Sequence, residues 1–224
     1  MRRFKMVIEA KHLAKRFGDK TLFTDLNLQI QAKDSIVITG DSGSGKSTLL
    51  NILSLIEGAD KGAIFWHGNE IEKINSTKAN KIIREEIGYV FQNYALIDNK
   101  TIYENVEIGT KYNQSINAKN KKEYVYDAIE SVGLSGLENR KVYSLSGGEQ
   151  QRVALARIIV KPCNIVFADE PTGNLDDENA NKILDILFNL NEEGKTIIVV
   201  THDHSIVSKF NKHVHLTEQK NQLY

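Results

Sequence analysis

Cysteine, proline and long apolar runs are scarce in this chain of 224 residues. The one cysteine, Cys163, cannot form a disulfide within the chain, which is typical of a reducing compartment. We expect Cys163 to be a small apolar residue of the core. No apolar run approaches the roughly 18 residues of a membrane-spanning helix, so any membrane part is expected on another chain. Arg2, Arg3 and Lys5 precede no apolar stretch, so a secretory signal is not predicted.

An excess of charge of either sign is also absent, because 29 Lys and Arg residues balance 29 Asp and Glu residues. This balance gives no reason to expect nucleic acid or an anionic membrane surface as a partner. The length suffices for one well-buried core with a smaller lobe. The lysine-rich stretch 119–123 is interpreted as a solvated helix face rather than a binding patch.

Hydrophobic periodicity predicts strands that alternate with helices along the chain. The predicted strands cover residues 5–13, 22–30, 35–39, 63–66, 87–92, 164–168 and 196–201, and 63–66 is expected to pair with 87–92. The predicted helices cover residues 47–57 (with Gly58 as the stop), 77–85 and 178–190, and residues 93–157 are expected to be mostly helical. This order predicts an α/β fold with a largely parallel sheet.

A glycine-rich loop stands between the predicted strand 35–39 and the helix that follows it. Gly40 to Ser47 match the pattern G-x-x-x-x-G-K-[ST], in which successive backbone N–H groups surround a phosphate at a helix N-terminus. Lys46 is expected to bridge the β- and γ-phosphates of ATP, and the Ser47 hydroxyl to ligate Mg²⁺. The expected nucleotide contacts here are Gly40, Asp41, Ser42, Gly43, Ser44, Gly45, Lys46, Ser47 and Thr48.

Two carboxylates, Asp169 and Glu170, close the apolar strand 164–168. An aspartate at this place can reach the magnesium shell, and the adjacent glutamate can polarise the water that attacks the γ-phosphate. Alone, such a pair is usually a helix cap or a solvated turn. Beside a phosphate loop, the catalytic interpretation is favoured, with Asp169 at the metal and Glu170 as the catalytic base.

The octapeptide Leu145-Ser146-Gly147-Gly148-Glu149-Gln150-Gln151-Arg152 resembles the signature loop of the ATP-binding-cassette (ABC) transporters. With the glycine loop and residues 165–170, the likeness covers nearly the whole chain. The resemblance implies a P-loop cassette made of a mostly parallel core sheet with helices on both faces. It also implies an N-terminal antiparallel β subdomain and an α-helical subdomain over about residues 93–157. All of these would form one domain, residues 1–224.

Further elements follow in the order of the family. Gln92 matches the glutamine loop that senses Mg²⁺ and the γ-phosphate, and His202 matches the switch histidine that contacts the γ-phosphate. Gly173-Asn174-Leu175-Asp176 matches the loop that crosses the dimer interface, with Asp176 counted among the nucleotide contacts. By the same likeness Phe17 would stack on adenine, where the family often has tyrosine. The alternative for Phe17 is a place in the core.

The signature also has its own physical interpretation. Ser146 and the amides of Gly147 and Gly148 begin a predicted helix, so they form a cluster of donors directed at an anion. In a fold of this kind the chain's own γ-phosphate lies too far away. The resemblance therefore implies a head-to-tail homodimer that holds two ATP molecules, each between one glycine loop and the partner's signature. Closure on ATP and release after hydrolysis would drive the membrane subunits.

Two segments indicate the branch of the family. Residues 169–176 resemble the lipoprotein-releasing, macrolide-efflux and antimicrobial-peptide-export branch, and residues 91–101 with 104–106 look closest to lactococcin-type bacteriocin exporters. The resemblance implies an ATP-hydrolysing subunit on the inner face of the cell membrane, bound to a separate export-type permease through Tyr94–Tyr103. Alternatively, the side chains of that segment only pack the helical lobe.

Two other functions are alternatives to an exporter subunit. The chain would serve a nutrient importer if its permease worked with a substrate-binding protein. It would be a cassette acting on DNA or ribosomes if no membrane partner existed, although one cassette without basic excess does not favour this. The chain departs from the usual pattern of the branch at two places: Asp41 stands where proline is frequent, and Lys33-Asp34 replaces a common Gly-Glu turn. Neither place supplies a catalytic group.

Overall fold

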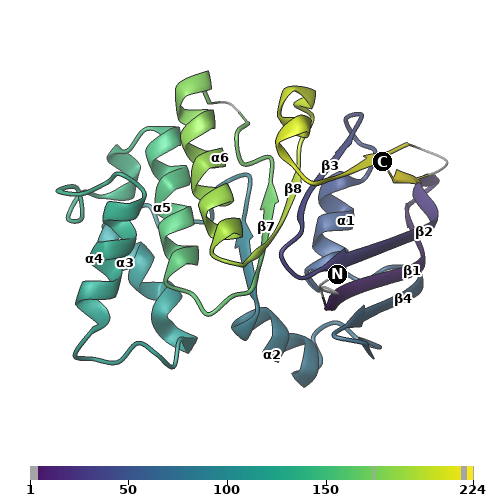
Figure 1. The fold of residues 1–224 in the computed structure, drawn as a ribbon, viewed down its shortest axis with the longest axis horizontal. Helices are drawn as coiled ribbons and strands as arrows, with labels where there is room; N and C mark the ends of the chain where they lie inside the picture. The colour runs from purple at the N-terminus through teal and green to yellow at the C-terminus, as the bar shows by residue number, and fades with distance from the viewer. Residues whose placement is uncertain (1–4, 174, 218–220, 224) are drawn as a thin grey trace.

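The computed structural model describes residues 5–173, 175–217 and 221–223, so Arg2 and Arg3 lie outside the described residues. Its first sheet is antiparallel, with the strand order β2-β1-β4-β5. This sheet lies at one side of the molecule (Figure 1). Its strands are β1 (Met6–Phe17), β2 (Lys20–Gln31), β4 (Lys61–Trp66) and β5 (Asn69–Glu70).

The second sheet has the strand order β10-β9-β3-β8-β7-β6. All neighbouring pairs are parallel except β10 with β9. Its strands are β3 (Ser35–Gly40), β6 (Ile87–Val90), β7 (Ile165–Asp169), β8 (Thr196–Val200), β9 (Lys212–Leu216) and β10 (Asn221–Leu223). Because the strands run parallel, the loops after β3, β6, β7 and β8 meet at one edge, where a ligand site is expected.

The helices form two groups on the second sheet (Figure 1). Helix α1 lies between this sheet and the antiparallel sheet, whereas α3, α4, α5 and α6 gather on the other side. The helices are α1 (Lys46–Leu53), α2 (Thr77–Glu85), α3 (Ile102–Glu107), α4 (Lys121–Ser131), α5 (Gly147–Ile159) and α6 (Asp177–Glu192). Short 3-10 turns cover Ile108–Tyr112, Val142–Ser144 and His204–Lys209.

Strand β8 shows why both faces of the sheet need helices. All five of its residues are buried, and successive side chains point to opposite faces. Ile198 and Val200 belong to the core shared with α1, while Ile197 and Val199 belong to the core shared with α6. Each fully buried aliphatic side chain stabilises the fold by about 1.5–3 kcal/mol. The prediction of a mostly parallel sheet with helices on both faces is therefore confirmed.

Two local predictions are wrong, and one strand was missed. Residues 61–66 pair with β1 in the antiparallel sheet, and β6 pairs with β7 in the other sheet, so the expected pairing of 63–66 with 87–92 does not form. Helix α1 ends at Leu53 and not before Gly58, because Leu55 turns left-handed with φ +63° and leaves Ile56 exposed. Strand β9 was not predicted.

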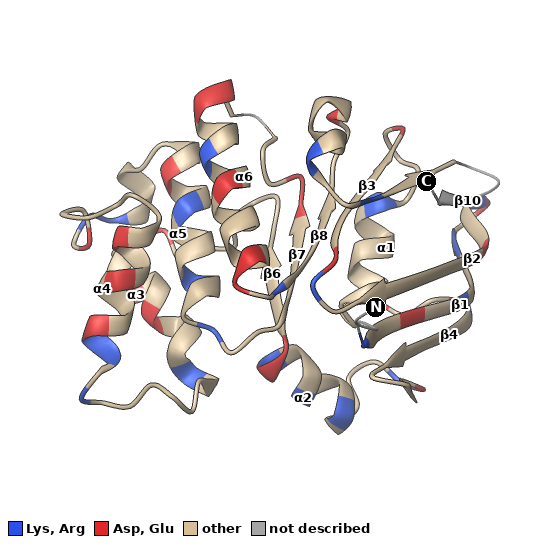
Figure 2. Cartoon of the chain, viewed as in Figure 1, with Lys and Arg blue, Asp and Glu red and all other residues tan. Residues whose placement is uncertain are grey.

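Other local predictions hold. The thiol of Cys163 is buried, and burial raises its pKa. Residues 119–123 lie on the surface at the start of α4, as a solvated face. Acidic and basic residues are interspersed over the helices and sheets (Figure 2). Within the described part of the chain, none of the helices has the length and apolar character needed to cross a membrane.

Candidate nucleotide site

The glycine loop connects β3 to α1 and depends on glycine at particular positions. At Gly45, which precedes the first residue of α1, φ is +96°, a conformation that side-chain-bearing residues rarely adopt. At Gly40 a Cβ atom would lie 2.5 Å from the Leu216 carbonyl oxygen, so β9 leaves no room for any other residue. The loop is therefore held close to the end of the sheet, directly before the N-terminus of α1.

Lys46 is buried and already oriented by its own loop. Its Nζ donates hydrogen bonds to the carbonyl oxygens of Gly40, at 2.8 Å, and Asp41, at 3.0 Å. The nearby Ser44 hydroxyl is also buried and has no hydrogen-bond partner among the described residues. A buried polar atom without a partner is costly. A phosphate held by the loop would accept from both groups, so these residues fit a bound nucleotide.

Ser47 and Asp169 meet across the end of the sheet. The Ser47 hydroxyl donates to Asp169 Oδ1 at 2.9 Å, although the residues are far apart in the sequence. Burial raises the pKa of the Asp169 carboxyl, and the Ser47 hydrogen bond opposes this shift. Hydroxyl and carboxylate oxygens are ligands that Mg²⁺ prefers, and a cation here would offset the cost of burying the carboxylate. The pair therefore fits a magnesium ion.

Glu170 lies next to Asp169 but contacts a different element. Its backbone is left-handed, with φ +46°, and its N–H donates to the Val200 carbonyl oxygen at 2.9 Å. The Glu170 carboxylate accepts from the His202 N–H at 3.3 Å, and its Oε2 lies 3.0 Å from His202 Nδ1. The strained backbone thus sets the Glu170 side chain beside the residue after β8, as strained residues in functional sites often do.

A cleft of about 450 Å³ lies over the glycine loop. It brings together most of the predicted site residues, although they come from widely separated parts of the sequence. Its lining consists of Phe17, Leu22, Ser42, Gly43, Gly45, Lys46, Ser47, Thr48, Gln92, Glu170, Gly173 and His202. Leu22, a strand residue whose side chain packs on Gly45, was not predicted, because no pattern in the sequence distinguishes it from other strand residues.

The remaining predicted site residues lie outside this lining. Gly40, Asp41 and Ser44 belong to the loop beneath it, and Asp169 is joined to it through Ser47. The signature residues and Asp176 lie on other elements and do not line the cleft of their own chain. The roles predicted for all of these residues stay predictions.

Phe17 lines the cleft. Its side chain is 53% exposed, so the alternative that it belongs to the core is wrong. The ammonium group of Lys15 lies 5.2 Å from the centre of the Phe17 ring, a cation–π contact. Lys15 is itself held by Glu57, at 2.9 Å, and by the Gly58 carbonyl oxygen, at 2.8 Å. The ring is thus available for stacking.

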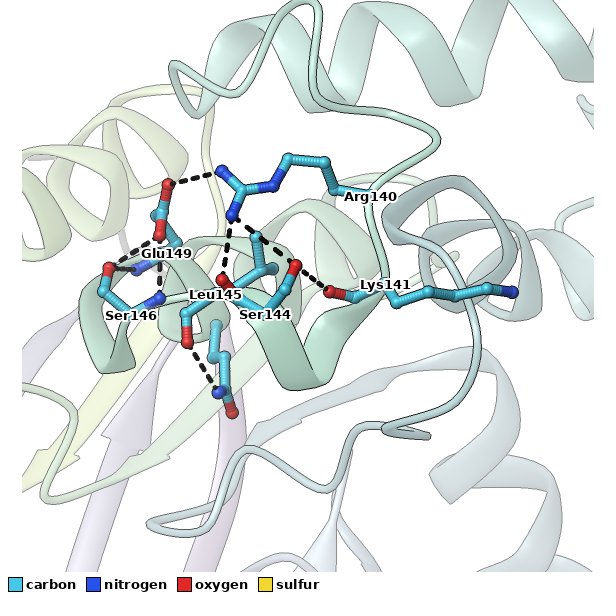
Figure 3. Close-up of polar contacts among 7 residues, drawn as sticks. Arg140, Lys141, Ser144, Leu145, Ser146 and Glu149 are labelled. Atoms are coloured by element: carbon cyan, nitrogen blue, oxygen red, sulfur yellow. Dashed lines mark hydrogen bonds and ion pairs between the residues drawn. The ribbon is translucent and has the colours of Figure 1, made fainter.

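The signature loop forms a closed set of hydrogen bonds at the start of α5 (Figure 3). Glu149 Oε2 accepts from the Ser146 N–H at 2.7 Å and from the Ser146 hydroxyl at 2.8 Å, and the Ser146 Oγ accepts from the Glu149 N–H at 3.3 Å. Arg140 reaches the same site, donating to the Ser144 carbonyl oxygen at 2.8 Å and approaching Glu149 Oε1 to 3.9 Å. The Ser146 backbone N–H in particular lowers the pKa of Glu149.

Asp176 caps the next helix. Its Oδ1 accepts from the Asn179 N–H at 2.9 Å at the start of α6. Asn179 in turn contacts α5. Its Oδ1 accepts a hydrogen bond from Arg152 Nη1 at 3.0 Å, and its side chain lies so near Gly148 that a Cβ atom added there would be 3.0 Å from it. Asp176 is thus connected to α5 through Asn179. Asn174, the second residue of the predicted interface loop 173–176, lies outside the described residues.

The strand, the glycine loop that begins a helix and the cleft above them define a P-loop nucleotide-binding protein. The sequence profile of the family described as ABC transporter matches residues 23–173. The chain belongs to the ABC transporter family, as its ATP-binding domain.

Relatives and solved structures agree with this assignment. The chain is 38% identical over 216 residues to the uncharacterized ABC transporter ATP-binding protein MJ1508 of Methanocaldococcus jannaschii, covering 95% of this chain and 96% of the relative. It is 38% identical over 209 residues to the macrolide export ATP-binding/permease protein MacB of Pasteurella multocida, covering 90% of this chain. A dimeric post-hydrolysis structure of the ATP-binding cassette MJ0796, bound to ADP and Pi, superposes with a TM-score of 0.86 at 32% identity, covering 96% of this chain and 98% of that one.

The relatives differ in length. The chain spans 32% of the P. multocida MacB protein, whose name includes a permease. It spans 91% of the cell division ATP-binding protein FtsE of Mycobacterium tuberculosis, to which it is 38% identical over 215 residues, or 93% of this chain. The chain therefore corresponds to about a third of the MacB relatives and to nearly all of MJ1508 and FtsE.

Proposed function

We propose that the cleft binds ATP with Mg²⁺ and hydrolyses the γ-phosphate, and that the chain acts as one of two cassettes that drive a membrane permease. The observation that carries the proposal is the convergence of Lys46, Ser47 with Asp169, and Glu170 with His202 on one cleft. These residues supply a cation for the phosphates, oxygens for a metal ion and a carboxylate for a water molecule, which is the set that phosphoryl transfer requires.

Each residue has a distinct task in the proposed reaction. Lys46 exchanges its two carbonyl partners for phosphate oxygens. Ser47 and Asp169, with Gln92, would hold a magnesium ion, which would offset the charge that develops on the phosphate. Glu170 orients and deprotonates the attacking water, and its contact with His202 keeps the carboxylate over the cleft. The exposed ring of Phe17 stacks on the base.

The proposal includes a second copy of the chain. Ser146, Gly147 and Gly148 begin α5 outside their own cleft, so their donors are available to a nucleotide in another cassette. The dimeric state of the MJ0796 cassette with ADP and Pi supports the same arrangement here. A two-fold axis would place each signature over the partner's cleft and create two equivalent sites.

The partner is proposed to be an export-type permease at the inner face of the cell membrane. The MacB relatives, named for macrolide export, support an export-type partner. The proposed substrate, an antimicrobial peptide, a bacteriocin or a lipoprotein-related molecule, or a mechanical role in its place, rests on the resemblance of residues 91–106 and 169–176 alone. The loop Tyr94–Tyr103 is proposed as the docking segment, since Ile97 is exposed there while Leu96 packs into the lobe. A permease that depends on a substrate-binding protein would favour the importer instead.

The test is steady-state ATP hydrolysis by the purified chain, alone and with the co-purified permease. We expect Mg²⁺-dependent release of phosphate whose rate rises faster than linearly with protein concentration, because two chains form the site. Absence of hydrolysis under both conditions, or a rate per chain that is independent of concentration in a chain shown to remain monomeric, would contradict the proposal.

A further inference from the structure

The segment that follows Gln92 contains two consecutive left-handed residues. Tyr94 has φ +62° and Ala95 has φ +46°, and neither is a glycine. The turn is closed by hydrogen bonds from the Tyr94 N–H to the Phe91 carbonyl oxygen and from the Ala95 N–H to the Asn93 carbonyl oxygen. Residues with side chains adopt this conformation at a cost and keep it only where the surrounding structure holds them.

Arg157 of α5 stabilises this left-handed turn. Its Nη1 donates to the Ala95 carbonyl oxygen at 2.6 Å, and its Nη2 donates to the Tyr94 carbonyl oxygen at 3.0 Å. Burial lowers the pKa of the Arg157 guanidinium, and no nearby carboxylate contributes to that shift. The group stays charged, and its planar fork matches two adjacent carbonyl oxygens in a way that a lysine cannot.

The same segment also contacts the start of α5. A Cβ atom at Gly147 would lie 3.1 Å from the Tyr94 hydroxyl oxygen. Further along, the N–H groups of Val142 and Tyr143 donate to the carbonyl oxygens of Lys100 and Asp98. The segment 93–101 thus runs from the cleft, which Gln92 lines, to the residues that precede the signature.

We propose that Arg157 is a positioning residue that holds the Tyr94–Ala95 turn left-handed and thereby fixes Gln92 relative to the signature at the other end of α5. The proposal rests on the function proposed above, in which Gln92 serves the cleft and the signature serves a second copy. Arg157 touches neither nucleotide nor metal in this scheme. Its effect passes through the two carbonyl groups that it binds and through the rigid helix to which it belongs.

A set of variants tests this role in the full chain. Arg157→Met keeps a long side chain but removes both donors, and Arg157→Lys keeps one charge without the fork. Ala95→Gly removes the cost of the left-handed conformation at one position, so it should compensate for loss of the arginine. Arg84→Met is the matched control, because Arg84 is an exposed arginine on α2.

Two readouts separate this proposal from the proposed function: kcat and KM for ATP hydrolysis, and hydrogen exchange of the peptide covering residues 91–97. We expect Arg157→Met to lower kcat and to speed exchange, each about tenfold, with KM changed by less than about twofold. Arg157→Lys should fall between Arg157→Met and the wild type. Adding Ala95→Gly to Arg157→Met should recover most of both losses, whereas Arg84→Met should change neither.

Two results would overturn the positioning role of Arg157. Wild-type exchange and kcat in Arg157→Met would overturn the positioning role. A loss that Ala95→Gly does not recover, with a lower melting temperature in both Arg157 variants, would make Arg157 a purely structural residue and also overturn it. The wild type could fail to hydrolyse ATP while Arg157→Met still speeds hydrogen exchange and Ala95→Gly reverses that change. The proposed function would then be wrong, but Arg157 would still stabilise the Tyr94–Ala95 turn.

Discussion

The cleft and the signature loop place carboxylates in opposite environments. In the cleft, burial raises the pKa of Asp169, and the Ser47 hydroxyl alone does not compensate. At the signature, the backbone and hydroxyl of Ser146 lower the pKa of Glu149, and Arg140 approaches its second oxygen. The cleft therefore holds a carboxylate whose charge its neighbours do not offset, whereas the charge of Glu149 is stabilised by hydrogen bonds within the first turn of α5.

This difference has a consequence for the proposed cycle. In that cycle, the buried groups of the cleft would gain partners when a metal ion and phosphates bind. The signature hydroxyl already donates to Glu149, so it must leave this bond before it can donate to a phosphate on another chain. Binding in the cleft is accordingly expected to precede closure of the dimer.

The largest expected effect comes from replacing Glu170, the proposed general base. Glu170→Gln should lower kcat by about 10²–10⁴-fold, the contribution of a positioned general base, while ATP still binds. Size-exclusion chromatography with saturating ATP should then show a trapped dimer. A variant that remains monomeric at saturating ATP would contradict the two-cassette arrangement for the isolated chain.

Lys46→Ala tests the phosphate-binding end of the same cleft. Loss of two charge-assisted hydrogen bonds to phosphate should weaken ATP binding by about 10²-fold or more, as measured by isothermal titration. Lys61→Ala, at an exposed lysine of β4, is the matched control and should bind like the wild type. Retention of tight binding in Lys46→Ala would count against the glycine loop as the nucleotide site.

Ser146→Arg tests the opposite region. A bulky cation at the signature should reduce steady-state hydrolysis about 10²-fold by blocking the partner's nucleotide, without changing the affinity of one chain for ATP. Ser115→Arg, at an exposed serine of the same lobe, controls for the added charge. Unchanged hydrolysis would remove Ser146 from the site, and weakened ATP binding would place its effect within its own chain.

The smallest effect concerns the stability of the metal-free protein. Because the folded pKa of Asp169 is raised, its protonated form stabilises the fold at low pH, and this contribution is lost as the pH rises through the folded pKa. Asp169→Asn should therefore raise Tm at neutral pH by about 2–4 °C and have little effect in acid. Calorimetry without Mg²⁺, with Asp185→Asn on the surface of α6 as control, measures this. A lower Tm at neutral pH would contradict a destabilising carboxylate.

Sequence patterns predicted the local parts of this molecule well and the long-range parts unevenly. The glycine loop follows a buried strand and begins a helix as expected, since backbone conformation at Gly45 depends on nearby residues. The helix expected to begin at Ser146 is likewise local, and the structure adds a capping box of Ser146 and Glu149 that was not predicted. Strand partners are not local, and for that reason residues 61–66 joined the antiparallel sheet against expectation.

At the site, too, long-range contacts were harder to predict than local ones. Lys46 was expected from the glycine-loop pattern, Glu170 from the acidic end of a strand and Gln92 from the family resemblance. None of these signals indicated the strained φ of Glu170. They also gave no sign of the Arg157 contact with the Tyr94–Ala95 turn, because the two are more than sixty residues apart and neither the helix pattern nor the turn predicts the other.

Mixing two inactive chains tests the central claim, that each cleft is completed by the signature of another copy. Lys46→Ala supplies a working signature and Ser146→Arg supplies a working glycine loop, so a mixed dimer holds one complete site. We expect each variant alone to be inactive and an equimolar mixture to recover roughly a quarter of the wild-type hydrolysis, since half of the dimers are mixed and each has one of two sites. A mixture no more active than the separate chains would contradict the account.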